Sequence, residues 1–311
     1  MLGRIHVIAW TAFTALLALL LPLSLVLGCV SGAFIGLATL RHGAREGLYV
    51  LLGALAGTGA VIWVLSGSPV PALVLAATLW VPAWLMAAGL RMTASPGWVL
   101  AVAGGCASGL VLMFRVVIED PTRWWLVRWE TWLTPPANGA AGSREGGAVQ
   151  GPGDVVPELL QFLEGIAPYM TGIVASAFLL VVLLTLFLAR WGHALLDNPG
   201  GFGEEFRALA LPRWFAHATG VVAIVLMVSS GGVKEAAAEI AMLMLLLLMV
   251  HGLAIAHGIV KLLEAARGWL VLLYLVLLVT PLSSFLVLAL AMAGLSDSWV
   301  GYRQRVHNRI T

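Results

Sequence analysis

Charged residues are scarce in this chain. Of its 311 residues, 10% are charged and 61% are hydrophobic, and the mean hydropathy is +0.99. A soluble domain of this size carries more charge, because its water-facing surface has to be polar. The net charge of +2 is also too small for the electrostatic attraction that nucleic-acid-binding proteins use. The composition therefore predicts a protein of the lipid bilayer and no nucleic-acid partner.

Cysteine is nearly absent, and the motifs of catalysis are missing. Cys29 and Cys106 both lie inside apolar runs without a charged neighbour, so we expect small packing residues and not a disulfide or a metal pair. No nucleophile elbow, phosphate-binding loop, His-Glu-x-x-His helix or paired-cysteine spacing occurs in the sequence. We therefore expect no catalytic residue, no metal and no cofactor, and an intramembrane enzyme is the least favoured function.

Apolar runs long enough to cross a membrane are abundant. A crossing helix needs about 20 residues. The runs that qualify are Val7–Leu21, Leu23–Leu40, Gly47–Leu65, Val70–Leu90, Gly97–Ile118, Ile166–Ala189, Trp214–Ser229, Ala236–Val260 and Gly268–Ala293. Pro22 separates the first two, which as one helix would be about 50 Å long, too long for one crossing. We expect an all-α, polytopic transmembrane helical bundle with about 8–10 membrane segments.

These runs divide the chain into three regions. An N-terminal five-span bundle covers residues 1–118, an outward-facing insert covers 119–165, and a C-terminal bundle covers 166–311 with a cytoplasmic loop at 190–213. The sides follow from the arginines, which gather in alternate short loops, because such loops face the cytoplasm.

The side of the C-terminal tail depends on the last apolar run. Nine full crossings from a cytoplasmic N-terminus would leave Arg303, Arg305 and Arg309 outside, against the positive-inside rule. Gly268–Ala293 is interrupted at Pro281, and a broken or re-entrant pair of half-helices would return the tail to the cytoplasm. We favour this arrangement, with a single kinked crossing as the alternative, since kinked membrane helices are common.

The insert begins with a tryptophan stripe. Within Arg123–Trp132, three tryptophans at positions 125, 129 and 132 fall on one helical face. Tryptophan favours the headgroup layer, so we expect a helix in the membrane interface, with an aromatic ligand platform as the alternative. For the rest of the insert we expect a disordered stretch and a short amphipathic helix, at Pro135–Gly153 and Asp154–Gly165 respectively.

Small residues recur every fourth position in three spans. Such spacing forms a groove that lets helices approach closely. We expect internal helix packing, and the docking of a partner membrane protein is the alternative. The glycines concerned are Gly28, Gly32 and Gly36 in the second span, Gly53 and Gly57 in the third, and Gly105 and Gly109 in the fifth.

Ionisable residues inside apolar runs are candidates for function. Arg115 and Glu119, spaced four residues apart, predict an ion pair, with the rim of a polar pocket as the alternative. His251 and His257 lie about 240° apart around a helix, which argues against a metal site on one helix. We expect His257 to share a face with Lys261 near the headgroups, and His251 to be either a functional group or a hydrogen-bonded packing residue.

The loop Arg190–Trp214 carries the most specific sequence. We expect a turn at Asn198–Gly203, because it is rich in Gly and Pro and does not follow a strand. Glu204–Leu211 then predicts a short helix on the cytoplasmic membrane surface, with Phe206 on its apolar face and its end at Pro212.

Short motifs in the loops and the tail carry a family resemblance. They are Leu40–Gly43 with Glu46-Gly47, Asn198–Phe206, Leu211–Trp214, Gly294–Trp299 and Tyr302-Arg303. In these motifs, and over nearly the whole chain outside the insert, the sequence resembles the YybS-like family of bacterial multi-pass membrane proteins. Its N-terminal half is similar to the S components of energy-coupling-factor transporters. The resemblance implies the bacterial cytoplasmic (inner) membrane and a bundle that binds a small solute and docks on a membrane partner.

Two functions follow as hypotheses. The first is S-component-like binding or transport of a small solute, whose identity the sequence does not give. The second is a membrane scaffold or assembly factor that recruits another membrane protein through loop 190–213 and the tail. Besides the ionisable residues, the candidate positions for ligand or partner contact are Phe206, Asp297 and Trp299.

Overall fold

The computed structural model describes residues 3–20, 24–133, 155–266, 268–278 and 282–310, and these residues form helices without a strand. In chain order the elements are α1 (Arg4–Leu20), α2 (Ser24–His42), α3 (Ala44–Ser66), α4 (Val70–Leu75), η1 (Ala76–Trp80), α5 (Val81–Thr93), α6 (Pro96–Val117), α7 (Pro121–Leu133), α8 (Val155–Ile166), η3 (Ala167–Tyr169), α9 (Met170–Asp197), α10 (Gly201–Ala208), α11 (Arg213–Val228), α12 (Gly231–Leu262), α13 (Gly268–Leu278), α14 (Ser283–Val300) and α15 (Tyr302–Ile310).

The helices confirm a polytopic membrane bundle. Seven of the described helical segments are long and apolar enough to cross a membrane, and an eighth span results if α10 and α11, bent by 49°, count as one. Helices α1 and α13 are apolar but shorter. Each apolar run expected to span the membrane is helical where the structure describes it, except that the last run comprises two helices, α13 and α14.

The fourth span contains a π-helical turn that the hydropathy pattern did not predict. Residues Ala76–Trp80 form this turn between α4 and α5. Pro82, two residues later, has no N–H group, and its ring would clash with the carbonyl of Thr78 in a regular α-helix. The wider turn accommodates the proline. It places Trp80 in the core, fully buried, where its Nε1 donates to Ser31 Oγ at 2.8 Å.

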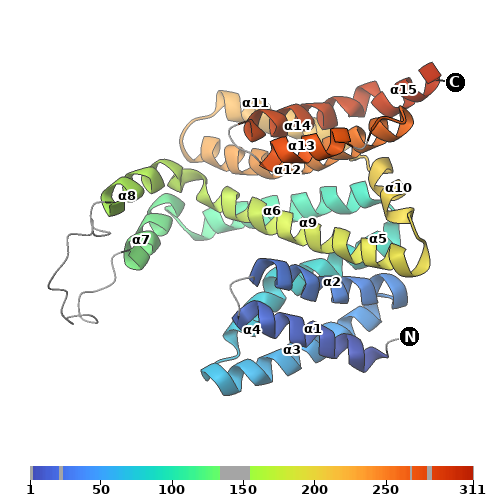
Figure 1. The fold of residues 1–311 in the computed structure, drawn as a ribbon. Helices are drawn as coiled ribbons and strands as arrows, with labels where there is room; N and C mark the ends of the chain where they lie inside the picture. Colours follow the sequence, from blue (N-terminus) through green and yellow to red (C-terminus); the bar gives the residue numbers. More distant parts are fainter. Residues whose placement is uncertain (1–2, 21–23, 134–154, 267, 279–281, 311) are drawn as a thin grey trace, which may run out of the picture.

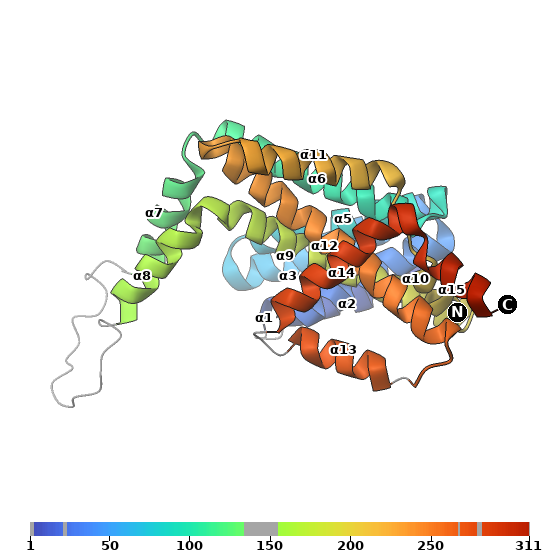
Figure 2. The ribbon, with the colours of Figure 1, turned by 90° about the horizontal axis from the view of Figure 1, so that it is seen from above.

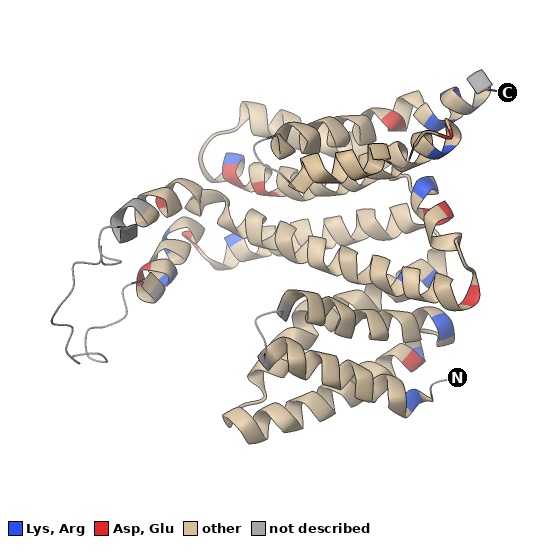
Figure 3. Cartoon of the chain, in the orientation of Figure 1, with Lys and Arg blue, Asp and Glu red and all other residues tan. Residues whose placement is uncertain are grey.

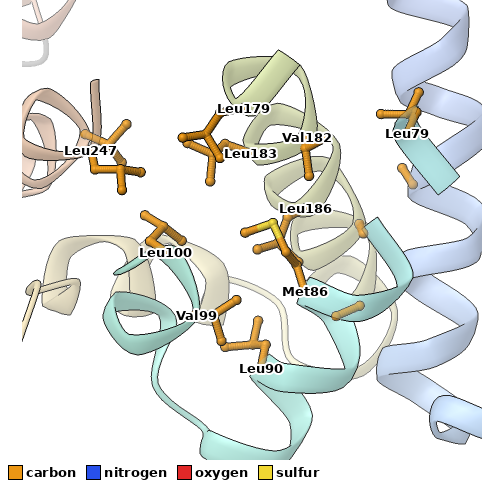
Figure 4. Close-up of a cluster of buried hydrophobic side chains, with 14 of the residues drawn as sticks. Leu79, Met86, Leu90, Val99, Leu100, Leu179, Val182, Leu183, Leu186 and Leu247 are labelled. Carbon is orange, nitrogen blue, oxygen red and sulfur yellow. The ribbon is translucent and has the colours of Figure 1, made fainter. Parts of the chain in front are cut away.

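Helix α9 lies at the centre of the bundle (Figure 1). It packs against α2 on one side and α12 on the other, and it also contacts α5 and α6. A continuous cluster of buried apolar side chains runs through these contacts, with Leu100 from α6, Leu183 from α9 and Leu247 from α12 at its middle (Figure 4). The N-terminal and C-terminal helices therefore share one packed interior.

Glycines bring α2 into close contact with α9. A Cβ atom added at Gly32 would lie 2.8 Å from Thr185 Cγ2, and one at Gly36 would lie 2.8 Å from Ala189 Cβ. Without a hydrophobic driving force between helices in lipid, such close backbone approach is a main source of packing energy. Gly53 of α3 is equally tight, with 2.8 Å from its added Cβ to Ile8 Cδ1.

Other glycines of the predicted set do not pack this way. Gly28 and Gly57 make ordinary contacts, with added Cβ atoms at 3.5 Å from Leu79 and 3.9 Å from Ala12. Among the described residues nothing lies within 4 Å of a Cβ added at Gly105 or Gly109, so internal packing was the wrong expectation for these two. The glycine of α6 that faces the interior is Gly104, against Leu247; it lies about 100° around the helix from Gly105.

Both termini lie at the same end of the bundle, here named the terminal end (Figure 1). Helix α13 has 11 residues, about 16 Å, which is too short for a hydrocarbon core of about 30 Å. The chain reverses between α13 and α14, so that α15 arrives at the terminal end (Figure 2). This agrees with the broken last span; the break predicted at Pro281 itself lies outside the described residues.

Charged residues gather at the two ends of the bundle (Figure 3). One group occupies the loops and short helices of the terminal end. The other lies around α7 and the start of α12, at the opposite end, here named the insert end. The helices between the ends are almost free of charge, as a membrane-embedded zone requires.

The insert contributes two helices, α7 and α8, at the insert end (Figure 1). The helix expected over Arg123–Trp132 is present, and Trp125 donates from Nε1 to Thr171 Oγ1 at 3.0 Å, which ties α7 to the start of α9. The guanidinium of Arg128 lies 4.2 Å from the ring centroid of Trp124. The helix expected at Asp154–Gly165 is α8. The stretch Pro135–Gly153, expected to be disordered, lies outside the described residues.

Candidate functional site

Helix α12 carries the two ionisable side chains that are buried among the described residues. Glu239 is 0% exposed and His251 is 1% exposed; the other buried polar residues are Ser and Thr. The two positions are twelve residues apart, about 18 Å along the helix. Glu239 therefore belongs to the insert end, whereas His251 lies in the half toward the terminal end.

Arg115 of α6 forms an ion pair with Glu239. Its Nε donates to Glu239 Oε2 at 2.6 Å, and its Nη1 lies 3.2 Å from Glu235 Oε2. The predicted pair of Arg115 with Glu119 is wrong. Helix α6 ends at Val117, so Glu119 is not one helical turn from Arg115, and it is exposed. The guanidinium turns instead into the bundle, toward α12.

Backbone groups complete this insert-end cluster. Arg115 Nη2 donates to Pro168 O at 2.9 Å, and the amide of Gly172 donates to Glu239 Oε1 at 3.1 Å. A Cβ atom at Gly172 would lie 2.6 Å from Glu239 Cβ, so glycine is required for this approach. Both oxygens of the buried carboxylate thus have a donor, which offsets much of the cost of burying the charge. The arrangement joins α6, η3, α9 and α12.

Sequence reasoning missed Glu239, although it lies inside the expected eighth span, Ala236–Val260. A signal was present. Glu235 and Glu239 are spaced four residues apart at the start of a long apolar run, and a carboxylate in that position needs a cationic partner from another helix.

The second cluster joins α12, α14 and α15. Asp297 Oδ2 lies 3.2 Å from His251 Nε2 and 3.2 Å from an Nη atom of Arg303. The amide of Tyr302 donates to Asp297 Oδ1 at 2.8 Å. The Asp297 side chain is 7% exposed and that of Arg303 is 20% exposed. His251 and Asp297 were both predicted as candidate residues, but nothing in the sequence brought them together, and Arg303 was counted only as a tail charge.

The imidazole of His251 is poorly satisfied. Although Nε2 is within ion-pair distance of Asp297, neither ring nitrogen has an aligned hydrogen bond among the described residues. Buried polar groups are nearly always hydrogen-bonded. His251 is therefore unusual, because its imidazole is buried beside a carboxylate and yet has no aligned hydrogen bond.

Two glycines set the spacing of this cluster. A Cβ atom at Gly252 would overlap the carbonyl oxygen of Leu290, and one at Gly294 would overlap that of Leu248 and lie 3.2 Å from His251 Cβ. The backbones of α12 and α14 are thus in direct contact. This contact holds Asp297 against His251.

Arg303 extends the cluster to the loop between α9 and α11. Its Nη1 donates to the carbonyl oxygens of Arg207 and Leu209, the latter at 3.1 Å. Helix α15 is thereby attached to the connection between α10 and α11. Nearby, Arg190 of α9 pairs with Glu205 of α10, with Nε 2.7 Å from Oε2.

The remaining predicted residues are spread over the terminal end. The ring of Phe206 faces inward. Its centroid lies 5.3 Å from the ring centroid of His257 and 5.7 Å from that of Phe187. His257 Nε2 lies 3.3 Å from Tyr274 Oη, and Lys261 is exposed at the last turn of α12. Trp299 is 61% exposed. Phe206 is therefore a packing residue of its own chain, whereas Trp299 is accessible.

Two hollows among the described residues lie away from both clusters. One, of about 20 Å³, lies between α5, α9 and α10 beside Arg190 and Glu205, with space for about one water molecule. The other, of about 420 Å³, is an open apolar groove between α12 and α13, lined by residues such as Val260 and Leu273. Neither touches His251 or Glu239.

No three His, Cys, Asp or Glu side chains come together as a metal-binding group in the described part of the chain. In comparisons with known proteins, no protein-family model, no curated protein and no solved structure matches this chain.

Proposed function

We propose that this protein is a bacterial inner-membrane protein that binds a small solute and takes part in its transport. The observation that carries the proposal is the cluster of His251, Asp297 and Arg303 inside an otherwise apolar bundle. Ionisable residues in membrane spans are costly, and they mark substrate and ion pathways in membrane proteins. A purely structural contact at this position would be at least as stable with apolar side chains.

The broken last span supports the same proposal. In many transporters, short or interrupted helices meet at the solute site, where their free backbone groups and helix ends contact the ligand. Here α13 has 11 residues, and α14 ends at Val300, three residues after Asp297. The resemblance to S components, which bind solutes in a helical bundle, points in the same direction.

Ligand-induced thermal stabilisation of the purified protein tests the proposal. A panel of vitamins, amino acids and other small metabolites is screened, and we expect at least one to raise the unfolding temperature in a concentration-dependent way. Asp297→Asn is expected to lose that rise, while the exposed control Lys261→Gln keeps it. A panel without any stabilising compound would refute solute binding.

A scaffold function is the second candidate, and the exposure of Trp299 favours it. A large apolar side chain that is 61% exposed, beside His217 of α11, is suited to contact with a partner protein. A photo-crosslinker at position 299 would capture this partner in native membranes, and a crosslinker at Phe206, which faces inward, serves as the negative control. Absence of a reproducible product at position 299 would refute this function.

A further inference from the structure

One carboxylate oxygen lies within ion-pair distance of a histidine and of an arginine. Asp297 Oδ2 lies 3.2 Å from His251 Nε2 and 3.2 Å from Arg303. Arg303 is always charged, whereas histidine changes its charge near neutral pH. With a neutral imidazole, Arg303 is the single cation on this oxygen. With an imidazolium, the two cations compete for it.

Protonation makes Nε2 a charged donor whichever tautomer the neutral ring adopts: it adds the hydrogen there in the Nδ1–H tautomer and gives the existing Nε2–H a positive charge in the other. An imidazolium carries a hydrogen on both ring nitrogens, so Nε2–H then faces Asp297 Oδ2. A charge-assisted hydrogen bond of this kind is roughly twice as strong as a neutral one. In this state Nε2 of His251, whose residue is 1% exposed, gains the partner that it lacks, whereas Nδ1 gains none from Asp297.

Arg303 couples the cluster to the loop. Besides Asp297, its guanidinium contacts the carbonyl oxygens of Arg207 and Leu209. If Asp297 Oδ2 turns to His251, Arg303 loses its buried anion and keeps only neutral carbonyl acceptors. Its side chain, already 20% exposed, can then move to water.

We propose that His251 is a proton-binding group, and that proton uptake transfers Asp297 from Arg303 to the imidazolium and so releases α15 from the connection between α10 and α11. The proton comes from water at the terminal end, where Arg303 is partly exposed, and binds a ring nitrogen without any other covalent bond being made or broken. The inference goes beyond solute binding, because it holds for the protein without a solute.

Among the described residues, the ion pair of His251 is with Asp297. The charged or titratable side chains that face His251 come from α14 and α15, namely Asp297 and Arg303; Tyr302 contributes its amide and directs its hydroxyl to Ser296. On the other helices packed against α12, Arg115 pairs with Glu239, Arg190 pairs with Glu205, and the ring of His217 lies against that of Trp299. On α12 itself, His257 contacts Tyr274.

Nitrogen NMR of the full-length protein in lipid nanodiscs tests proton binding. With ring-labelled histidine, 7 residues give signals, and His251→Gln identifies one of them by its loss. We expect that signal to change from the neutral to the imidazolium pattern between about pH 8 and pH 5. His257→Gln, the control, leaves this change intact. A His251 signal that keeps one form over this range would overturn the proposal.

Pulsed electron–electron distance measurement tests the release of α15. Spin labels replace the exposed residues Glu204 and Arg305 in a chain with Cys29→Ala and Cys106→Ala. We expect a narrow distance distribution at pH 8 that lengthens and broadens at pH 5. His251→Gln keeps the narrow distribution at both values, and Arg303→Gln gives the broad one at both. The same pH response in His251→Gln would overturn the coupling.

The two proposals fail separately. Titration of His251 with release of α15, but no stabilising solute, would retain the proton switch and refute solute binding. A stabilising solute together with a His251 signal that does not change with pH would retain solute binding and refute the proton switch.

Discussion

At the scale of single residues, burial distinguishes side chains that look equivalent in the sequence. Glu235 and Glu239 both lie at the start of α12 and both approach Arg115, but their side chains are 31% and 0% exposed. A solvated ion pair contributes little to stability, whereas a buried charge that loses its partner is strongly destabilising. Glu239 should therefore determine the stability of the insert end.

Substituting these two glutamates separates the effects. Glu239→Gln leaves Arg115 without its buried anion, and we expect it to lower the free energy of unfolding by about 3–5 kcal/mol. Glu235→Gln, the matched control, should cost less than about 1 kcal/mol. Denaturant unfolding in detergent micelles measures both. Equal effects of the two substitutions would show that Glu239 is not the main partner of Arg115.

The hydrogen bond inside the N-terminal helices offers a second comparison. Ser31→Ala leaves the Nε1–H of the fully buried Trp80 without an acceptor, and we expect a loss of about 1–3 kcal/mol in unfolding free energy. Ser108→Ala removes a hydroxyl that bonds only to its own helix, at Gly104 O, and should change stability by less than about 0.5 kcal/mol. A Ser31→Ala protein as stable as Ser108→Ala would contradict the role of Ser31.

At the scale of helices, hydropathy predicted where most elements lie but not how they meet. A long run of apolar residues indicates a segment that lies in the lipid bilayer. Every expected span is helical in the described part of the chain. The neighbours of a helix depend on which face it presents, and an evenly apolar helix gives no sign of that face. Arg115 and Glu239 are 124 residues apart, so neither periodicity nor spacing could pair them.

The same ambiguity explains the glycines of α6. Spacing predicted Gly105 and Gly109 as packing positions, but Gly104 faces α12. A one-residue step rotates the contact face by about 100°. The π-helical turn before Pro82 was also not predictable. The proline is visible in the sequence, but whether the helix accommodates it by a kink or by a wider turn depends on the packing around Trp80.

The crossing of α12 and α14 gives a prediction for an element. Gly252→Ala places a methyl group into the carbonyl of Leu290, so the helices must separate, and we expect a cost of about 1–3 kcal/mol together with changed spectra of His251. Gly105→Ala, on an open helix face, should be neutral or stabilise by about 0.5–1 kcal/mol. Unfolding measurements on both proteins provide the check, and an equally harmless Gly252→Ala would exclude a tight crossing.

At the scale of the whole molecule, the two clusters lie in opposite halves of one helix, and each joins α12 to different neighbours. The insert-end cluster involves α6, η3 and α9, with every oxygen of Glu239 satisfied. The other involves α14 and α15 and contains the unaligned imidazole. If the Glu239 cluster stays fixed and the His251 cluster rearranges, movement is confined to α14, α15 and the connection between α10 and α11.

Placement of the C-terminus tests the global arrangement. Because α13 is too short to cross and α15 lies at the terminal end, a reporter fused after Thr311 should report the same side of the membrane as one inserted after Gly200, which we expect to be the cytoplasm. Alkaline phosphatase at either position should then be inactive and green fluorescent protein fluorescent. Phosphatase inserted after Gly146 should be active, since we expect the insert to face the other side. An active phosphatase after Thr311 would mean that α13 and α14 together make one full crossing, which would separate Arg303 from the connection it contacts and remove the basis of the proton switch.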